Sequence, residues 1–267
     1  MSQPLLVRDA ESDKAYVRTA DPNELPTLAR LLRRAFINDP MMNYIANLEE
    51  PLSNDTETPG RRNLEDFQRM VLTAAMYSGG RITVVVIPKL SDDDATVYQD
   101  KIVAVAIWMP PHIRIGLNHP WTLLRSGLLR TVWRSGWTGA RRAGFEYPNQ
   151  VEKVFTEIYK RRGPNETEHD AWYLQIIATD PEEQGKGYMS RLVREAFAHA
   201  PDDVTFVLEA TTPKSRDQYA HLGFQPEGPI PIGKGYADIN GYRTSGEDAT
   251  GFDLYAMVKW KDLGNDD

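Results

Sequence analysis

The sequence predicts an α/β protein that forms one elaborated domain around a mixed sheet. The 267 residues are 41% hydrophobic, which is enough for one sizeable core and favours a single domain over 1–267. Strand patterns alternate with helix patterns over 171–222, as is typical of parallel neighbours in a sheet. Two strand patterns at 81–88 and 101–109 flank an acidic turn and predict an antiparallel hairpin in the same sheet.

The N-terminal third is expected to hold a short strand and two helices. Apolar residues recur at helical spacing over 25–36, and the pattern stops at the pair "DP". The polar stretch 49–63 has no periodicity and is predicted to be a loop. A second helical pattern follows over 64–75, and paired glycines end it.

Residues 110–169 contain two helical patterns and are predicted to be a helical insertion before the next strand. The first pattern, "WTLLRSGLLRTVWRSGWTGARRAGF", is rich in tryptophan and arginine. Such a helix is typical of a membrane surface, of nucleic-acid binding, or of a helix that packs its aromatic residues inward. We favour the inward packing of Trp121, Trp133 and Trp137. We also expect the segment to cover the substrate site.

The C-terminal part continues with strands and short helices. A strand over 171–180 precedes a turn and a helix, and a strand over 202–211 precedes a short helix. A further strand begins near 223, and the last one covers 252–260. The stretch 226–251 is rich in turn residues and is predicted to be a flexible loop.

The tetrapeptide GKGY occurs twice, and only the first copy has the context of a phosphate site. Gly185 to Tyr188 follow a strand and open a helix, whose free amides and positive end attract an anion. Gly185 and Gly187 would let the backbone approach an oxygen, and Lys186 would add a charge. The alternative is that the glycine pair only forms a turn, which is its more common role. The second copy, at 233–236, precedes no helical pattern and is assigned to the loop.

Composition excludes several classes of site. The chain has no cysteine, which removes disulfides, thiolate metal sites and a cysteine nucleophile. The histidines show no metal-binding spacing, so no metal is expected. A net charge of −7 argues against nucleic acid as a partner. With no signal-peptide pattern and no apolar run of spanning length, we expect a cytoplasmic protein without a membrane partner.

The motif "QGKGYM" resembles the pyrophosphate loop of the GNAT superfamily of acetyl-coenzyme A-dependent N-acetyltransferases, with Met189 where the family has a small residue. A second block, "LEATTPKSRDQYAHLGF", resembles the family's later motif and ends in Tyr219, Gly223 and Phe224. These blocks and "AFINDPMMNYI" are most similar to the puromycin N-acetyltransferase-like branch. The resemblance is good over 170–226, loose over 15–109, and includes 252–260 as the closing strand.

The resemblance implies a splayed sheet with the pantetheine arm of acetyl-coenzyme A between the strands "LQIIAT" and "FVLEA". It implies that the strand end and the following loop contact the coenzyme. The residues assigned to coenzyme binding are Ile177, Ala178, Thr179, Gln184, Gly185, Lys186, Gly187, Tyr188, Met189, Ser190 and Ser215. It also implies that Tyr219 donates the proton to the departing thiolate.

Acetyl transfer to an amine needs a neutral amine, a polarised carbonyl and a proton for the thiolate. A phenol of pKa near 10 is a weaker acid than a thiol of pKa near 8.5, by about 1.5 units. Tyr219 is therefore expected either to donate a hydrogen bond and release its proton late, or to have a lowered pKa. Alternation would place Tyr173, Gln175, Ile177 and Thr179 on the acceptor side, where Tyr173 and Gln175 are substrate candidates but not bases. Glu209, acting through water, and the pair His169-Asp170 are the remaining bases.

The sequence therefore predicts an N-acetyltransferase that uses acetyl-coenzyme A and acts on a small-molecule amine by direct attack in a ternary complex. An alkylamine near pKa 10.4 is mostly protonated at pH 7, so a chain without a strong base suits a weakly basic amine. Acetylation of a protein or peptide amine, and a coenzyme A-binding sensor without catalysis, are the alternatives. A monomer or a homodimer is expected.

Overall fold

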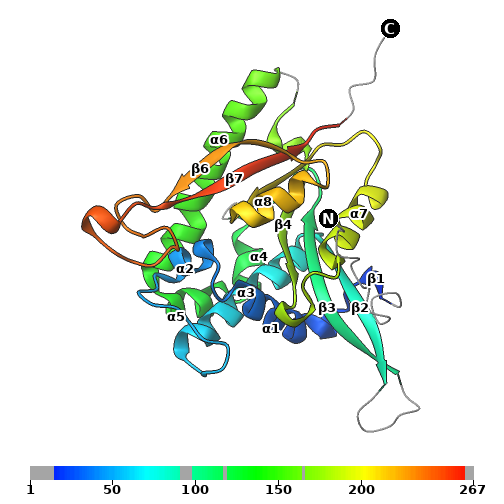
Figure 1. Ribbon diagram of the computed structural model, residues 1–267, viewed down its shortest axis with the longest axis horizontal. Coiled ribbons are helices and arrows are strands. Elements are labelled where there is room, and N and C mark those ends of the chain that lie inside the picture. The colour runs from blue at the N-terminus through cyan, green and yellow to red at the C-terminus, as the bar shows by residue number, and fades with distance from the viewer. Residues whose placement is uncertain (1–14, 91–97, 117–118, 164–165, 262–267) are drawn as a thin grey trace, which may run out of the picture.

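The computed structural model describes residues 15–90, 98–116, 119–163 and 166–261, and one seven-stranded sheet runs through them (Figure 1). The strand order is β1-β2-β3-β4-β5-β7-β6, and only β4 and β5 are parallel neighbours. The mixed sheet predicted from the strand patterns is therefore confirmed. The strands are β1 Tyr16–Thr19, β2 Arg81–Leu90, β3 Tyr98–Met109, β4 Trp172–Thr179, β5 Phe206–Ala210, β6 Gln225–Ile232 and β7 Phe252–Lys259.

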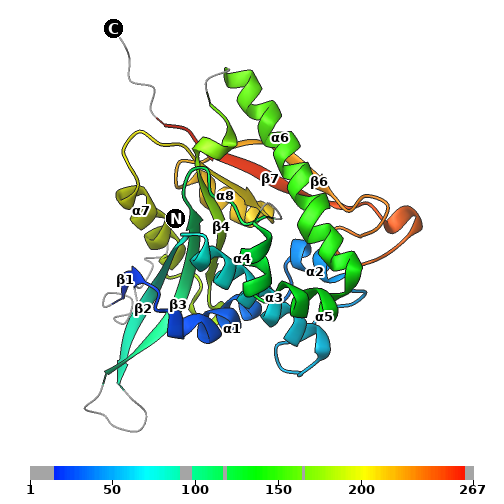
Figure 2. The same ribbon diagram turned by 180° about the vertical axis from the view of Figure 1, so that it is seen from behind.

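Helices cover both faces of the sheet. Six helices lie on one face (Figure 2), where they enclose the larger apolar core. Two helices lie on the other face, over a second core that contains Trp108 and Phe206. The first group is α1 Leu25–Phe36, α2 Pro40–Ala46, α3 Pro59–Tyr77, α4 Pro120–Arg125, α5 Leu128–Arg141 and α6 Tyr147–Arg162; the second is α7 Tyr188–His199 and α8 Pro213–Ala220.

The parallel pair β4 and β5 separates after two residues. Trp172 pairs with Phe206 and Tyr173 with Val207, and the ladder between these strands then ends. At this point β4 contains a β-bulge, because Leu174 lies opposite Trp108 and Ile176 lies opposite Ile107, which leaves Gln175 as an extra residue. A bulge bends its strand and increases the local twist. The bend therefore carries β4 away from β5, as the expected splay requires.

Two helix boundaries differ from the prediction. The pair Asp39-Pro40 ends the first helix but also starts α2, because the Asp39 carboxylate accepts hydrogen bonds from the amides of Met41 (2.9 Å) and Met42 (3.1 Å). Proline suits the first turn of a helix, where its missing amide hydrogen is not needed. The predicted loop 49–63 is shorter than expected, since α3 begins at Pro59 behind the Thr58 cap.

The prediction of a flexible loop over 226–251 is wrong at its start. Residues 225–232 form β6 and pair with β7 over the whole length of the strand. After the strand, backbone hydrogen bonds connect Gly235 to Ala249 (2.8 Å) and Arg243 to Leu48 (2.6 Å). Gly241 lies against α2 so closely that a built Cβ would come 2.0 Å from the Pro40 carbonyl oxygen. The rest of the segment is therefore packed against the body of the protein.

The inward packing predicted for the tryptophans of 121–137 is also wrong. Trp121, Trp133 and Trp137 are 77%, 83% and 74% exposed. Arginines take the inward positions instead, because Arg134 pairs with Asp66 on α3 and Arg142 is 5% exposed beneath Tyr44. The outward tryptophans leave a large apolar surface on this face of the protein.

Candidate active site

The carboxylate of Glu209 lies where β4 leaves β5. Continuing the register of the two paired positions would put Glu209 beside the bulged residue Gln175. The Oε2 atom of Glu209 accepts hydrogen bonds from the hydroxyls of Tyr173 (2.7 Å) and Tyr147 (2.9 Å). The Oε1 atom is buried, and among the described residues it has no hydrogen-bond partner. A buried oxygen of this kind is suited to a ligand that brings its own donor.

The surroundings of Glu209 bring its pKa close to neutrality. Burial raises the pKa of Glu209 to about 6, while hydrogen bonds from Tyr173 and Tyr147 and the charge of Arg114 act in the opposite direction. The Arg114 guanidinium lies 4.9 Å from the centre of the Tyr173 ring. Burial and the nearby Glu209 charge also raise the pKa values of both tyrosines, so each remains a hydrogen-bond donor. A carboxyl group whose pKa lies this close to neutrality is suited to acid–base chemistry.

Tyr147 is a member of this cluster that the sequence did not predict. It begins α6, in the inserted helical segment, and it reaches Glu209 across 62 residues of sequence. The segment thus contacts the site through Tyr147 and not through its tryptophans. In the sequence Tyr147 stands before Pro148 between two helical patterns, and only its long-range contact with Glu209 reveals its place in this cluster.

The face assignment predicted for β4 is wrong. The expected set was Tyr173, Gln175, Ile177 and Thr179, but the bulge at Gln175 shifts the alternation by one residue. Tyr173 and Ile176 face the larger core, whereas Leu174 and Ile177 face the other one. Tyr173 therefore stays on the Glu209 side, because Val207 two residues before Glu209 faces the same core.

Tyr219 lies on the opposite face of the sheet. It belongs to α8 and packs against Phe224, with ring centroids 5.7 Å apart, in the core that α7 and α8 cover. Burial and the Glu209 charge raise the pKa of Tyr219, so the lowered pKa considered from the sequence is not found. Within the described part of the chain, its hydroxyl makes no hydrogen bond. Tyr219 thus remains a donor that has no acceptor among the described residues.

Backbone groups line the opening between the strands. Asp180 donates its amide to the Val103 carbonyl of β3 (2.8 Å). Because amides alternate sides along a strand, the amides of Thr179 and Ile177 point away from β3, toward the side that β5 has left. An extended ligand such as a pantetheine arm could pair with these groups as a strand would. The backbone of Ala178 is turned toward β3.

The first GKGY forms the turn that leads into α7. Gly185 and Gly187 have φ values of 85° and 77°, which glycine adopts at low cost, and a Cβ built on either would meet no atom within 4 Å. Gly187 is the N-cap of α7 and provides no side-chain hydrogen bond, so the first amides of the helix are not capped by a side chain. Gln184 is exposed beside this turn, and Met189 and Ser190 lie in the first turn of the helix. This geometry fits a pyrophosphate group.

Three of the predicted coenzyme contacts have other partners for their side chains. Lys186 forms an ion pair with Glu183 (3.1 Å) and does not extend alone into the turn. The Tyr188 ring is 1% exposed in the core beneath α7, so only its backbone faces the turn. The Ser215 hydroxyl belongs to the capping box of α8, where it donates to the Thr212 carbonyl (2.9 Å).

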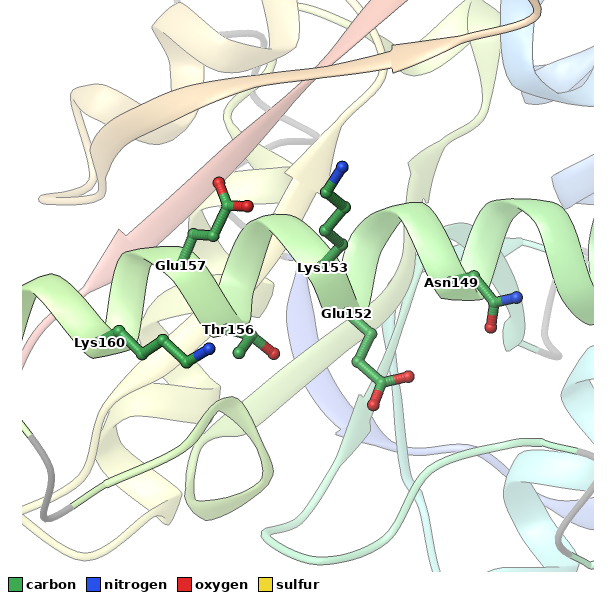
Figure 3. Close-up of a pocket in the computed structure, with 6 residues that line it drawn as sticks. All are labelled: Asn149, Glu152, Lys153, Thr156, Glu157 and Lys160. Carbon is green, nitrogen blue, oxygen red and sulfur yellow. The ribbon is translucent and has the colours of Figure 1, made fainter.

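The other candidate base is engaged in local structure. Asp170 caps a helical turn by accepting from the Thr167 amide (2.8 Å), and it lies 3.4 Å from the His112 ring nitrogen. His169 is half exposed near the start of β4. A hollow on the surface of α6 is lined by exposed polar residues of that helix alone (Figure 3). Neither place combines residues from several elements, as the Glu209 cluster does.

No group of three or more potential metal ligands occurs among the described residues. In the same part of the chain, no helix has both the length and the apolar content that crossing a bilayer demands.

Residues 154–224 match the model of the acetyltransferase (GNAT) family. The match includes β4, the turn into α7, β5 and the helix that carries Tyr219. A curated relative, an uncharacterized N-acetyltransferase of Schizosaccharomyces pombe, is 26% identical over 121 residues. That stretch is 45% of this chain and 46% of the relative, so less than half of either protein is compared.

Solved structures share the fold over most of their length. A Corynebacterium glutamicum protein described as histone acetyltransferase HPA2 and related acetyltransferase has 23% identity and a TM-score of 0.56, and the match covers 94% of this chain and 99% of that one. A mosquito arylalkylamine N-acetyltransferase like 5b has 15% identity and a TM-score of 0.51, with 92% and 99% covered. At these identities the likeness shows the fold alone.

Proposed function

We propose that this chain, whose residues 154–224 match the acetyltransferase (GNAT) family, is an acyltransferase that transfers an acetyl group from acetyl-coenzyme A to a small-molecule amine. The observation that carries the proposal is the Glu209 carboxylate, held by two tyrosines at the point where β4 and β5 separate. A family match alone gives no proton acceptor for the amine. We propose that Glu209 is this acceptor.

The acceptor amine is proposed to enter from the α6 face. Its ammonium would donate to the free Oε1 atom of Glu209, which has no other partner among the described residues. With a pKa of about 6, Glu209 is mostly ionised at neutral pH and can remove this proton. The amine then attacks directly, and this chain has no cysteine to form an acyl-cysteine intermediate. Tyr173 and the bulged Gln175 would border the acceptor.

The coenzyme is proposed to lie on the other side of the opening. When bound, it supplies an acetyl group activated as a thioester. The amides of Ile177 and Thr179 would hold its extended arm, and the turn 184–190 would hold the pyrophosphate through backbone groups. Tyr219, on the same face as α7, would donate a hydrogen bond to the departing sulfur and release its proton late, as its raised pKa requires.

The pKa of Glu209 favours a weakly basic acceptor. Proton transfer from an ammonium of pKa 7.5 to a carboxylate of pKa about 6 is uphill by about 2 kcal/mol. The same transfer from an alkylammonium of pKa 10.4 is uphill by about 6 kcal/mol. Among similar structures, an agmatine N-acetyltransferase with 14% identity shares only the fold, so the acceptor class rests on the chemistry of the site.

The test is release of free thiol from acetyl-coenzyme A, corrected for hydrolysis, across amines whose pKa values range from about 7 to 10. The expected result is acceptor-dependent release that is fastest for the weakly basic amines. Tyr219→Phe is expected to lower kcat while the coenzyme still binds. An unchanged kcat in that variant would remove the assignment of Tyr219.

Two other functions remain distinguishable by the same assay. Coenzyme binding without release from any amine would support a coenzyme A-binding sensor. Release with peptide or protein amines, but with none of the small amines, would support a protein acetyltransferase. Similarity to the puromycin N-acetyltransferase-like branch and a cytoplasmic location stay predictions.

A further inference from the structure

The helices α4 and α5, together with the short helical segment Arg142–Glu146 that follows them, expose a group of large apolar residues, called here the tryptophan face. Its members are 52% to 83% exposed, although aromatic residues of this size are usually well buried. Leu129 and Trp133 lie one turn apart on α5, and Trp137 follows a kink at Gly136, whose φ of 75° and ψ of 170° interrupt the helix. The tryptophan face consists of Trp121, Leu129, Trp133, Trp137 and Phe145.

The outward direction of these residues is fixed by contacts on the inner side of the helices. Arg134 forms an ion pair with Asp66 on α3, and its backbone carbonyl accepts from the Asn63 side chain (3.1 Å). Arg142 donates to the Tyr44 carbonyl (2.6 Å) and lies over the Tyr44 ring. The tryptophans therefore face outward because the inner side of the segment is anchored by polar contacts.

The tryptophan face is basic within an acidic protein. Residues 120–145 contain five arginines and no aspartate, glutamate or lysine, whereas the whole chain has a net charge of −7. The Arg130 side chain is 59% exposed and that of Arg141 is 52% exposed. Their ion pairs, with Asp66 and Glu146, use acidic residues that are much less exposed than the arginines.

We propose that the tryptophan face docks the protein on an anionic lipid surface. Indole rings prefer the boundary between headgroups and acyl chains, and arginine is attracted to anionic lipid. A helix with apolar aromatic residues along one side and arginines beside them lies flat in that boundary. The net charge of −7 means that an anionic surface repels the chain as a whole, so docking requires a basic face such as this one.

A second copy of the chain fits the tryptophan face less well. A two-fold dimer would place this face against itself and bring arginines against arginines. Their acidic partners, Asp66 and Glu146, lie outside 120–145 and are less exposed than Arg130 and Arg141. A lipid surface supplies the missing negative charge together with an apolar layer for the indole rings.

The test uses the full chain and vesicles of phosphatidylcholine with or without about 30 mol% phosphatidylserine. Binding is measured by co-sedimentation and by quenching of tryptophan fluorescence with brominated lipid. The protein is expected to bind only the anionic vesicles, and less so when salt rises from about 0.1 M to 0.5 M. The Trp133→Ala/Trp137→Ala variant is expected to bind at least about ten-fold more weakly.

The matched control is Tyr236→Ala/Ile239→Ala, whose parent side chains are 63% and 70% exposed on the segment 233–251, outside the tryptophan face. It is expected to bind the vesicles like the unmodified chain. Equal binding by the tryptophan variant, or no binding of the unmodified chain to anionic vesicles, would overturn the proposal. A dimer in sedimentation equilibrium that the tryptophan variant loses, without vesicle binding, would assign the face to a second copy instead.

Discussion

Glu209 owes its proposed chemistry to an imbalance between its two oxygen atoms. The Oε2 atom accepts hydrogen bonds from the hydroxyls of Tyr147 and Tyr173. The Oε1 atom is buried, and none of the described residues donates a hydrogen bond to it. Burial of a carboxylate favours its protonated form. The two tyrosines and Arg114 prevent the pKa from rising further than about 6. The residue can therefore take up a proton from an ammonium and return it to water.

A first prediction concerns the pH dependence of catalysis. The kcat/KM of the unmodified chain should rise with pH through about 6, as Glu209 loses its proton. Glu209→Gln should lower kcat/KM at pH 7 by about 100-fold or more and should remove this inflection. Steady-state rates between pH 5 and 9 measure both effects, and coenzyme affinity serves as the control. An inflection that persists in the variant would assign it to another group.

A second prediction separates Tyr147 from a merely structural residue. Tyr147→Phe removes one hydrogen bond to ionised Glu209, so the pKa of Glu209 should rise. The inflection of the rate profile should move to higher pH by about one unit, given the usual strength of such a bond. Tyr173→Phe should act in the same direction. Tyr219→Phe, on the opposite face, should leave the inflection in place, and a shift there would contradict the assignment.

At the scale of elements, the segment after β6 depends on one close approach to α2. Gly241 has a φ of 80°, and a built Cβ would lie 2.0 Å from the Pro40 carbonyl oxygen. Gly241→Ala should therefore lower the free energy of unfolding by more than about 2 kcal/mol. Gly246→Ala is the matched control, because its φ is 71° but no atom lies within 4 Å of a built Cβ. That variant should lose only about 1 kcal/mol.

Urea unfolding followed by circular dichroism measures the two losses. Similar losses in the two variants would mean that α2 and the segment after β6 separate without cost.

Local patterns predicted the elements well, and they failed where the outcome depends on a distant partner. The strand, turn and helix around Gly187 were predictable because each signal lies within the same 30 residues. The faces of β4 were not, since the bulge is defined by pairing with Trp108 on β3. The tryptophans of α5 were assigned inward because the sequence does not reveal that Asp66 holds Arg134 on the inner side.

The same limit applies to the site. The sequence predicts Glu209 as a candidate base because it shows a carboxylate near the end of a predicted strand. Its two tyrosine partners lie 36 and 62 residues away, and their effect on its pKa follows only from the fold. The strength of the candidate base was therefore beyond the sequence.

At the scale of the whole molecule, the site reduces stability at neutral pH. The folded pKa of Glu209 is about 6 and its ordinary value is 4.5, so the unfolded chain releases this proton first as pH rises. The unmodified chain should therefore lose stability relative to Glu209→Gln between pH 4.5 and 6, and the difference should level off above that range. The loss should be about 2 kcal/mol.

Urea unfolding of both proteins from pH 4.5 to 8 measures this difference. Asp39, whose pKa burial also raises, is present in both proteins and cancels. A difference that stays constant with pH would mean that Glu209 has the same pKa in the folded and unfolded chains.

A single residue, Gln175, keeps the sheet open between β4 and β5. Leu174 and Ile176, on either side of Gln175, point to opposite faces of the sheet and have regular partners on β3. Deleting Gln175 would therefore preserve every other pairing between β4 and β3. The shortened strand would run straight, and its ladder with β5 could extend past Val207. Such a protein is expected to fold at least as stably as its parent and to bind no coenzyme, which would separate the architecture of this molecule from its chemistry.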